Sequence, residues 1–423
     1  MTRKLIDDCF RSGSGDGQRL AHGEALALIR DRVAPVVASQ QVPLAAALGR
    51  IAARDIAAPI AVPGHTNSAV DGYAFAHRDY DRDAGSTLPV VGRLAAGGGA
   101  SRKFAAGTAA RIFTGAMLSP PLDTVAMQED CGREDGKVFV PAGLKAGANV
   151  RRAGEDVDAG ERVVAAGAMI RAPEIAQLAA LGIAHIEVFE RPRVGLVATG
   201  DEVRRGGVLG LGEVYDVNTP LLTALLSNSV AMAADLGVWP DGRGEVIRRL
   251  GDAAGRFDLI LTSGGASQGE EDHISHALAA LGSRAFWQIA VKPGRPLMLG
   301  QIGDTVVVGL PGNPVAVFAC FLMYVFPLLR QLGGGAWREP RRFSVPAAFT
   351  FEGRKVGRRE FWRGTLVAGP DGLVVTKFPH DGSGLISGLR AANGLIDIAE
   401  NVPGVVPGQM VDFIPFSEFG IID

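Results

Sequence analysis

The sequence has few cysteines: Cys9, Cys131 and Cys320 are the only three among 423 residues. They lie far apart, and no C-x-x-C pair or Cys/His spacing typical of a zinc site is present. A disulfide framework is therefore excluded as the basis of the fold, and a reducing, cytoplasmic location is expected.

An excess of one charge and an apolar run of membrane length are also lacking. Lys+Arg number 43 and Asp+Glu 45, so the chain has no general attraction for a nucleic-acid backbone. The longest apolar segment, residues 315–329, is shorter than the roughly 20 residues of a membrane span, and Pro327 interrupts it. We expect a buried core helix there, with neither a nucleic acid nor a membrane as partner.

Most standard catalytic signatures are missing as well. There is no G-x-x-x-x-G-K-[ST], no H-E-x-x-H and no G-x-G-x-x-G at the end of a strand. Residues 265–269 match the G-x-S-x-G elbow of serine hydrolases, but Thr262 and Ser263 separate Ser267 from the preceding apolar run. Nothing around His380 marks it as a triad partner, so a serine hydrolase remains a weak alternative.

Glycine and proline, in contrast, are abundant, with 57 and 24 residues, which indicates many turns in a globular protein of several domains. Residues 1–21 are polar where a signal peptide would be apolar, and we expect a flexible leader. Helical spacing in 22–60 and again in 152–190 predicts a helical N-terminal linker domain. Between them, 61–151 has short β-branched runs separated by glycine, which predicts an inserted small β domain.

From residue 191 to 337 the pattern is strand, loop and helix, repeated. Continuous apolar strands that alternate with amphipathic helices indicate a parallel sheet covered on both faces, so we expect a three-layer α/β/α domain. Residues 338–423 return to short strands with glycine turns, which predicts a C-terminal β barrel or, as the alternative, a sandwich. The expected fold class is a multidomain protein of α/β and β domains.

Three loops follow apolar strands of the α/β domain, at residues 199–203, 262–273 and 309–314. In an open parallel sheet such loops meet at the carboxyl ends of the strands, where ligands bind. Their glycines let backbone N–H groups approach an anion, and the helices that follow add the positive ends of their dipoles. An ordinary turn is the alternative for any one of these loops.

Acidic residues share this edge of the predicted sheet: Asp201, Glu202, Glu270, Glu271 and Asp272. Carboxylates beside a phosphate would repel it unless a hard cation lies between them, and Mg²⁺ binds carboxylates together with phosphate oxygens. A bound divalent cation is therefore expected. The alternative, acids that only favour a helix N-terminus, is stronger for Glu270 and Glu271.

A basic pair, Lys292 and Arg295, flanks a Pro-Gly turn between two apolar strands that we expect in the same domain. The turn makes the two side chains converge, so they are candidates for binding a phosphate or a tetrahedral oxyanion. Three more glycine-flanked stretches in the first half carry polar side chains and are equally compatible with plain turns or surface salt bridges: residues 63–75, 111–118 and 149–160.

These stretches occur in the order and approximate spacing of one known family. In chain order they read NSAVDGYA, RIFTGA, NVRRAGEDV, VATGDEV, VYDVNTP, LTSGGASQGEEDH, VKPGRP and GLPGNP, followed by GSGLISGLRAANGLI. The family that they resemble is MoeA, the molybdopterin molybdenumtransferases, whose relatives include the C-terminal domain of gephyrin. The resemblance runs from about residue 23 to the end of the chain.

The resemblance implies an elongated homodimer of four-domain subunits, with the active site where the α/β domain of one subunit meets the β domain of the other. It implies insertion of molybdenum from molybdate into adenylylated molybdopterin, with Mg²⁺ assisting and AMP released. Further implied partners are the molybdopterin adenylyltransferase and apo-molybdoenzymes. The alternatives are a non-catalytic scaffold of the gephyrin type and a nucleotide-dependent hydrolase or adenylyltransferase on the same α/β domain.

The resemblance also implies roles for individual residues of the α/β domain. Glu202 and Asp272 resemble the ligands of the cation, and Lys292 with Arg295 resembles the catalytic basic pair at the oxyanion. Asp241 stands where the family has a functional aspartate and is a further catalytic candidate.

In the inserted β domain, Asp71 and Thr114 resemble catalytic residues that reach in from the partner subunit, and Arg151 resembles a cofactor-binding arginine. The other candidates for binding the nucleotide and the pterin are loop residues of the α/β domain: Ser263, Gly264, Gly265, Ser267, Pro311, Gly312 and Pro314.

The chain departs from the family pattern at Thr66, Val70, Pro121 and Leu122, and these changes look tolerable. Gln288 stands where many members have a lysine or an arginine, so we expect one positive charge near the anion to be missing.

Overall fold

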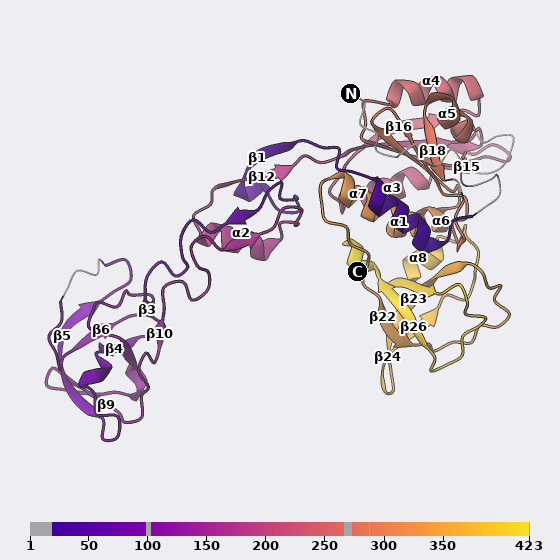
Figure 1. Cartoon of the computed structure of the whole chain (residues 1–423). Helices are drawn as coiled ribbons and strands as arrows, with labels where there is room; N and C mark the ends of the chain where they lie inside the picture. Colours follow the sequence, from indigo (N-terminus) through magenta and orange to yellow (C-terminus); the bar gives the residue numbers. More distant parts are fainter. Residues whose placement is uncertain (1–18, 99–102, 266–272, 287, 423) are drawn as a thin grey trace.

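The structure is a computed structural model that describes residues 19–98, 103–265, 273–286 and 288–422. Figure 1 shows an elongated molecule with a β-rich unit at one end and a larger α/β unit at the other. A small middle unit connects the two, and the C-terminal β unit lies beside the α/β unit.

The β-rich unit at the far end is the predicted inserted domain. Its six-stranded sheet has the order β7-β4-β6-β5-β9-β8, and a short pair, β3 with β10, lies where the chain enters and leaves. Apolar side chains on the two faces form two clusters, one around Ile112 and Val125 and one around Phe75 and Val138. The strands are β3 (Asn67–Ser68), β4 (Gly72–Phe75), β5 (Ser86–Leu94), β6 (Ala109–Ile112), β7 (Thr124–Met127), β8 (Gly132–Glu134), β9 (Lys137–Val140) and β10 (Val150–Arg151).

The middle unit is less helical than predicted. It has one helix and two antiparallel strand pairs, and the predicted helix beyond residue 44 is a 3-10 turn, Leu44–Ala46, followed by extended chain. Ala52 pairs with Val188 in a β-bridge there, so tertiary pairing overrides the local helical spacing. The elements are α2 (Ala172–Ala180), β1 (Ser39–Pro43) with β12 (His185–Phe189), and β2 (Ile56–Ala57) with β11 (Arg162–Val164).

The first helix, α1 (His22–Arg32), belongs to the core of the α/β unit rather than to the linker. Its Ala25, Leu26 and Ile29 are buried against the helix that contains Tyr324, and His22 hydrogen-bonds the hydroxyl of that tyrosine. The predicted leader is also ordered at its end, because Leu20 bonds to Gln288 and Ala290.

The α/β unit has a six-stranded sheet of order β16-β13-β17-β21-β20-β18. Four neighbouring strands are parallel, as predicted, but β20 is antiparallel to both of its neighbours, β21 and β18, so the sheet is mixed. A two-residue turn joins β20 to β21, and so tight a turn connects only antiparallel strands. The strands are β13 (Arg193–Thr199), β16 (Met232–Trp239), β17 (Leu259–Ser263), β18 (Ser283–Phe286), β20 (Met298–Ile302) and β21 (Thr305–Leu310).

Helices cover both faces of this sheet, which confirms three layers. Leu259 and Leu261 point into one apolar cluster with helices α1, α3, α6 and α7, while Ile260 between them points into another with α4 and α5. The helices are α3 (Asn218–Ser227), α4 (Arg243–Ala253), α5 (His273–Leu281), α6 (Pro314–Cys320) and α7 (Phe326–Leu332).

The apolar helix at Pro314–Leu332 is long and apolar enough to span a membrane by length and composition, but 83% of its 18-residue window is buried inside the protein. It is the expected core helix. Pro327 does not interrupt it, because a π-helical segment, Phe321–Val325, connects α6 to α7 just before the proline. The wider turn accommodates a residue that has no N–H for the α-helical pattern.

The C-terminal unit is a curved six-stranded sheet whose path is β19-β23-β25-β26-β22, with β24 paired to β23. Ala347, after β22, bridges Val375 in β24 around a core that includes Trp362 and Phe413. The elements are β19 (Val291–Lys292), β22 (Phe343–Pro346), β23 (Arg359–Gly369), β24 (Gly372–Lys377), α8 (Ser387–Ala391), β25 (Gly394–Ile398) and β26 (Met410–Pro415).

Candidate functional site

Three of the predicted ligand loops meet at one edge of the α/β sheet. The last residues of β13, β17 and β21 are neighbours in the register, with Ala198 beside Ser263 and Ser263 beside Leu310. The N–H of Gly264 donates to the carbonyl of Leu310 at 3.3 Å, and the hydroxyl of Thr199 donates to the carbonyl of Ser263 at 3.4 Å. The carboxyl ends of the parallel strands therefore bring these loops together, as expected from topology.

The two glycines after β17 are required by the backbone. Gly264 and Gly265 have φ values of +90° and +63°, and a Cβ on Gly264 would lie 2.8 Å from the hydroxyl oxygen of Thr199. Side chains are excluded from this turn, so its peptide groups stay accessible at the end of the strand. Ser267 lies outside the described residues, and its predicted role is not addressed by the structure.

Asn218, at the start of α3, ties two of the loops together. Its Nδ2 donates to the hydroxyl oxygen of Ser263 at 2.6 Å and to the carbonyl oxygen of Gly312 at 2.7 Å. Asn218 is buried, and its Oδ1 has no partner among the described residues. The sequence reasoning assigned no role to this residue, although the motif VYDVNTP contains it.

Asp201 and Asp241 hold the loops after β13 and β16 against each other. The N–H of Asp201 donates to Asp241 Oδ2 at 3.1 Å, and the N–H of Asp241 donates to Asp201 Oδ1 at 3.1 Å. Each carboxylate thus has one oxygen committed to the other loop, which gives Asp241 a positioning role in this geometry.

Glu202 is exposed, and its carboxylate folds over Gly200, where a Cβ would overlap it. The other predicted metal ligand, Asp272, lies outside the described residues. Within the part of the chain that the structure describes, no group of three or more His, Cys, Asp or Glu side chains is arranged to hold a metal.

Lys292 lies in a different sheet from the one predicted. Its strand, β19, pairs in parallel with β23 of the C-terminal unit, with Lys292 beside Glu360 in the register. The sequence predicted that the basic turn lies between two strands of the α/β domain. This prediction is wrong for β19, because the alternation of apolar residues along a strand does not indicate which sheet the strand joins. In the turn itself, Gly294 has φ +109°, and a Cβ there would overlap the thiol of Cys320 in α6.

A cavity of about 440 Å³ opens between this turn, the Pro311–Gly312 loop and the C-terminal unit. One acidic side chain lines it among the described residues, Asp381. The cationic side chains that line it are Arg19, Lys292, Arg295, Arg358, Arg363 and Lys377. The predicted pair therefore belongs to a larger basic cavity. Its other cations are Arg363 in β23, Lys377 in β24, Arg358 just before β23, and Arg19 from the segment before α1.

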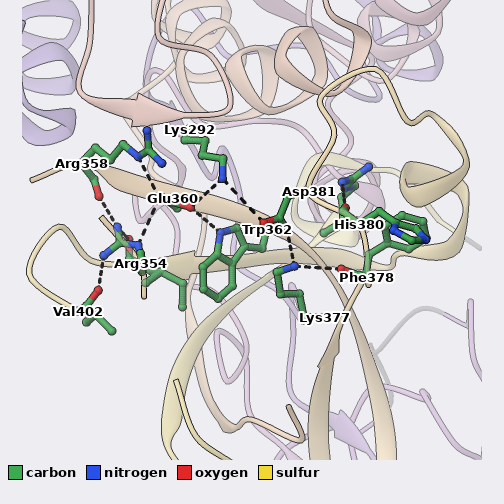
Figure 2. Close-up of polar contacts among 12 residues, drawn as sticks. Lys292, Arg354, Arg358, Glu360, Trp362, Lys377, Phe378, His380, Asp381 and Val402 are labelled. Carbon is green, nitrogen blue, oxygen red and sulfur yellow. Dashed lines mark hydrogen bonds and ion pairs between the residues drawn. The ribbon is translucent and has the colours of Figure 1, made fainter. Parts of the chain in front are cut away.

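A buried carboxylate behind the cavity lining, Glu360, binds several of the cations (Figure 2). Glu360, only 1% exposed, accepts hydrogen bonds from Trp362 Nε1 at 2.8 Å and from Arg358 Nε at 2.9 Å. Arg354 Nε lies 3.5 Å and Lys292 Nζ 3.7 Å from the same carboxylate. One negative charge is thus shared by three cations, so the cavity keeps a positive excess.

Arg363 shapes the loop that forms the far wall. Its guanidinium donates to the carbonyl of Leu385 at 2.8 Å and to the carbonyl of His380, and it lies 4.8 Å over the ring of Phe378. His380 thus lies on the cavity wall, with its backbone carbonyl bound to Arg363.

Arg19 supplies a charge beside Gln288, where the sequence predicted a missing one. Its Nε donates to Gln288 Oε1 at 3.4 Å, and the pairing of Leu20 with residues 288–290 directs this arginine to the cavity. Position 19 fell in the predicted leader, so nothing in the local pattern marked it.

The inserted domain brings its own candidates together. Asp71 Oδ1 accepts hydrogen bonds from the N–H and the hydroxyl of Thr114, both at 2.8 Å, and these bonds lower the pKa of Asp71. Arg151 in β10 is paired with Asn67 in β3, and Ser68 bonds to the turn after Thr114. Three motifs therefore form one end of this domain.

These residues do not meet the basic cavity within one chain. Figure 1 places β3, β4 and β10 at the opposite end of the molecule from α6 and β23. The two predicted halves of the site are therefore separate in a single subunit.

Comparison with known families covers most of the chain. Residues 20–182 match the MoeA N-terminal region (domain I and II), residues 195–331 a probable molybdopterin binding domain, and residues 347–416 the MoeA C-terminal region (domain IV).

Relatives named molybdopterin molybdenumtransferase include a Haemophilus influenzae protein, 36% identical over 88% of this chain and 92% of its own length, and a Nostoc protein, 35% identical over 88% and 87%. A crystal structure of the molybdopterin biosynthesis MoeA protein of Pyrococcus horikoshii OT3 is 27% identical, with a TM-score of 0.82 over 94% of this chain and 100% of that one. The order of motifs, the fold and these similarities agree, and the chain belongs to the MoeA family.

Proposed function

We propose that this protein inserts molybdenum from molybdate into adenylylated molybdopterin and releases AMP, the last common step of molybdenum cofactor biosynthesis. The observation that carries the proposal is the basic cavity, in which six cationic side chains surround about 440 Å³ next to the loop at Pro311 and Gly312. Such a cavity suits a small tetrahedral oxyanion such as molybdate, because several cations compensate its double charge.

The nucleotide part of the substrate is assigned to the glycine turn after β17. The turn at Gly264 and Gly265 has no side chains, and Asn218 holds it beside the Gly312 loop that borders the cavity. Backbone N–H groups at the end of a parallel strand bind phosphates without a charged side chain. A substrate bound at both loops would have its pterin end near the oxyanion.

We assign Mg²⁺ to Glu202 and Asp272 at the same edge. Glu202 presents a carboxylate with no ion pair or hydrogen bond to the described residues, and oxygen donors are those that Mg²⁺ prefers. Glu202 would hold the cation with Asp272, whose position the structure does not describe. The cation supplies positive charge to the phosphate that leaves with AMP.

A homodimer would complete the site. Asp71, Thr114 and Arg151 lie at the far end of each subunit, so a second copy is needed to bring them to the cavity. The loop between β14 (Val203–Arg204) and β15 (Val214–Tyr215) supports this, because its Val208 and Leu211 are fully exposed and suit a protein interface.

A cytoplasmic location and contacts with the molybdopterin adenylyltransferase and with apo-molybdoenzymes complete the proposal. Cys131 and Cys320 are free thiols, as suits a reducing compartment. The adenylyltransferase would supply the substrate, and the apo-molybdoenzymes would accept the product.

The test is AMP release from adenylylated molybdopterin by the purified protein, with and without molybdate. Release that requires molybdate supports the proposal. Release that is independent of molybdate would instead indicate a hydrolase, and no release in either case would indicate a scaffold.

A further inference from the structure

Asp381, in the loop after β24, lies between two lysines of the basic cavity (Figure 2). Its Oδ1 is 2.5 Å from Lys377 Nζ, and its Oδ2 is 3.9 Å from Lys292 Nζ. The two lysines come from β24 and β19, which do not pair with each other. The carboxylate therefore connects two cations that a bound oxyanion would also be expected to connect.

Lys377 requires an anion at this position. Its side chain is only 9% exposed, and its Nζ lies 5.5 Å from the centre of the Trp362 ring. A buried ammonium without a counter-ion is strongly destabilised, so some negative charge must remain beside Lys377 whether or not substrate is bound.

The two carboxylates next to Lys292 differ in their freedom to move. Glu360 is 1% exposed and is held by hydrogen bonds from Trp362 and Arg358. Asp381 is 40% exposed, and its ion pairs within the described part of the chain are with the two lysines. Rotation of the Asp381 side chain into solvent therefore breaks contacts to these lysines without disturbing the core, whereas Glu360 is fixed.

We propose that Asp381 is an intramolecular counter-ion that occupies part of the oxyanion position in the empty protein and is displaced when the substrate oxyanion binds. This inference rests on the proposed function, since it assumes that molybdate enters this cavity. The carboxylate stabilises the empty cavity, where Lys292 and Lys377 would otherwise repel each other. Because it must be displaced, it also lowers the affinity of the cavity for the oxyanion. The oxyanion can then leave without exposing unpaired charges.

The test compares Asp381→Asn with a matched control, Asp371→Asn, in the full-length protein. Both variants lose one negative charge, and Asp371 lies in the turn between β23 and β24, outside the residues that line the cavity. Asparagine at 381 keeps an oxygen for Lys377 but removes the competing charge. Titration calorimetry with molybdate is expected to give a Kd about tenfold lower for Asp381→Asn, and an unchanged Kd for Asp371→Asn.

A second measurement follows the stability of the empty protein. Without molybdate, Asp381→Asn should have a lower Tm than the wild type, and saturating molybdate should reduce the difference, because the bound oxyanion replaces the missing counter-ion. A Kd that is unchanged or higher in Asp381→Asn, or a Tm deficit that molybdate does not reduce, would overturn the inference.

If molybdate binds only after the nucleotide substrate, the wild type and Asp381→Asn are compared by their KM for molybdate in AMP release. An unchanged KM in Asp381→Asn, with molybdate-dependent release in the wild type, would refute the counter-ion role alone. Absence of molybdate binding together with molybdate-independent release would refute the proposed function itself.

Discussion

Replacement of Asn218 by aspartate tests whether one buried amide holds the two ligand loops together. Aspartate has the same shape, but it places an acceptor where Asn218 Nδ2 now donates to Ser263 Oγ at 2.6 Å and to the Gly312 carbonyl at 2.7 Å. The Gly312 carbonyl would lose its donor and face a negatively charged oxygen instead.

The cost can be worked from these contacts. Two buried hydrogen bonds contribute about 1 kcal/mol each, and an unsatisfied buried acceptor adds about 1–3 kcal/mol, so a loss of about 3 kcal/mol is expected. In a unit the size of residues 191–337, this corresponds to a Tm about 10 °C lower. The KM for adenylylated molybdopterin should rise as well, because the Gly264 turn loses its support.

Asn228→Asp is the matched control, since Asn228 is exposed at the other end of the same helix. It should cost less than about 1 kcal/mol, the size of a helix-dipole effect. Differential scanning calorimetry and steady-state AMP release measure both variants. If Asn218→Asp has the same Tm as Asn228→Asp and the same KM as the wild type, the Asn218 amide does not hold the two loops together.

The other predictions concern charge and pH. Arg19→Ala should raise the KM for molybdate about three- to tenfold because it removes a cavity cation, and adding Gln288→Lys should restore it; equal KM values for Arg19→Ala and the wild type would contradict a role for Arg19 at the oxyanion. Thr114→Ala removes the hydroxyl donor but keeps the backbone N–H donor, so the lowering of the Asp71 pKa is lost in part and the acid limb of the AMP-release profile should move to higher pH, whereas Thr114→Ser should leave it in place. Burial lowers the pKa of His22 from 6.5 to about 4, so the unfolded chain gains a proton that the folded protein does not, and stability falls as pH decreases through this window. His22→Gln should remove about 2 kcal/mol of that loss at pH 5, and parallel Tm–pH curves for the two proteins would disprove it.

The strands of the α/β sheet show where sequence patterns are sufficient. Leu259–Ser263 and Thr305–Leu310 are continuous apolar runs, and their burial on both faces follows directly from that composition. The direction of β20 was missed, because apolar periodicity is the same in parallel and antiparallel strands. The signal was present in the two-residue turn Gly303-Asp304, which is typical of a hairpin.

The basic cavity shows where sequence patterns are not sufficient. Lys292 and Arg295 are marked by their Pro-Gly turn, but Arg363 and Lys377 lie in strands more than sixty residues away. Basic residues in such strands are normally solvated, and nothing local distinguishes a side chain that lines a cavity from one that faces water. The role of Asp381 was hidden for the same reason.

The sequence by itself determined most of the local elements of this protein, because apolar spacing selects strand or helix and glycines select turns with positive φ. The helix predicted beyond residue 44 is the exception, since β pairing replaced it. It also determined the family, because many ordered motifs occur together. Only the tertiary structure decided that Lys292 joins the C-terminal sheet, that Asn218 connects two loops and that Asp381 lies between two lysines. These features are contacts between residues distant in the chain, and such contacts depend on how units pack, which no local pattern encodes.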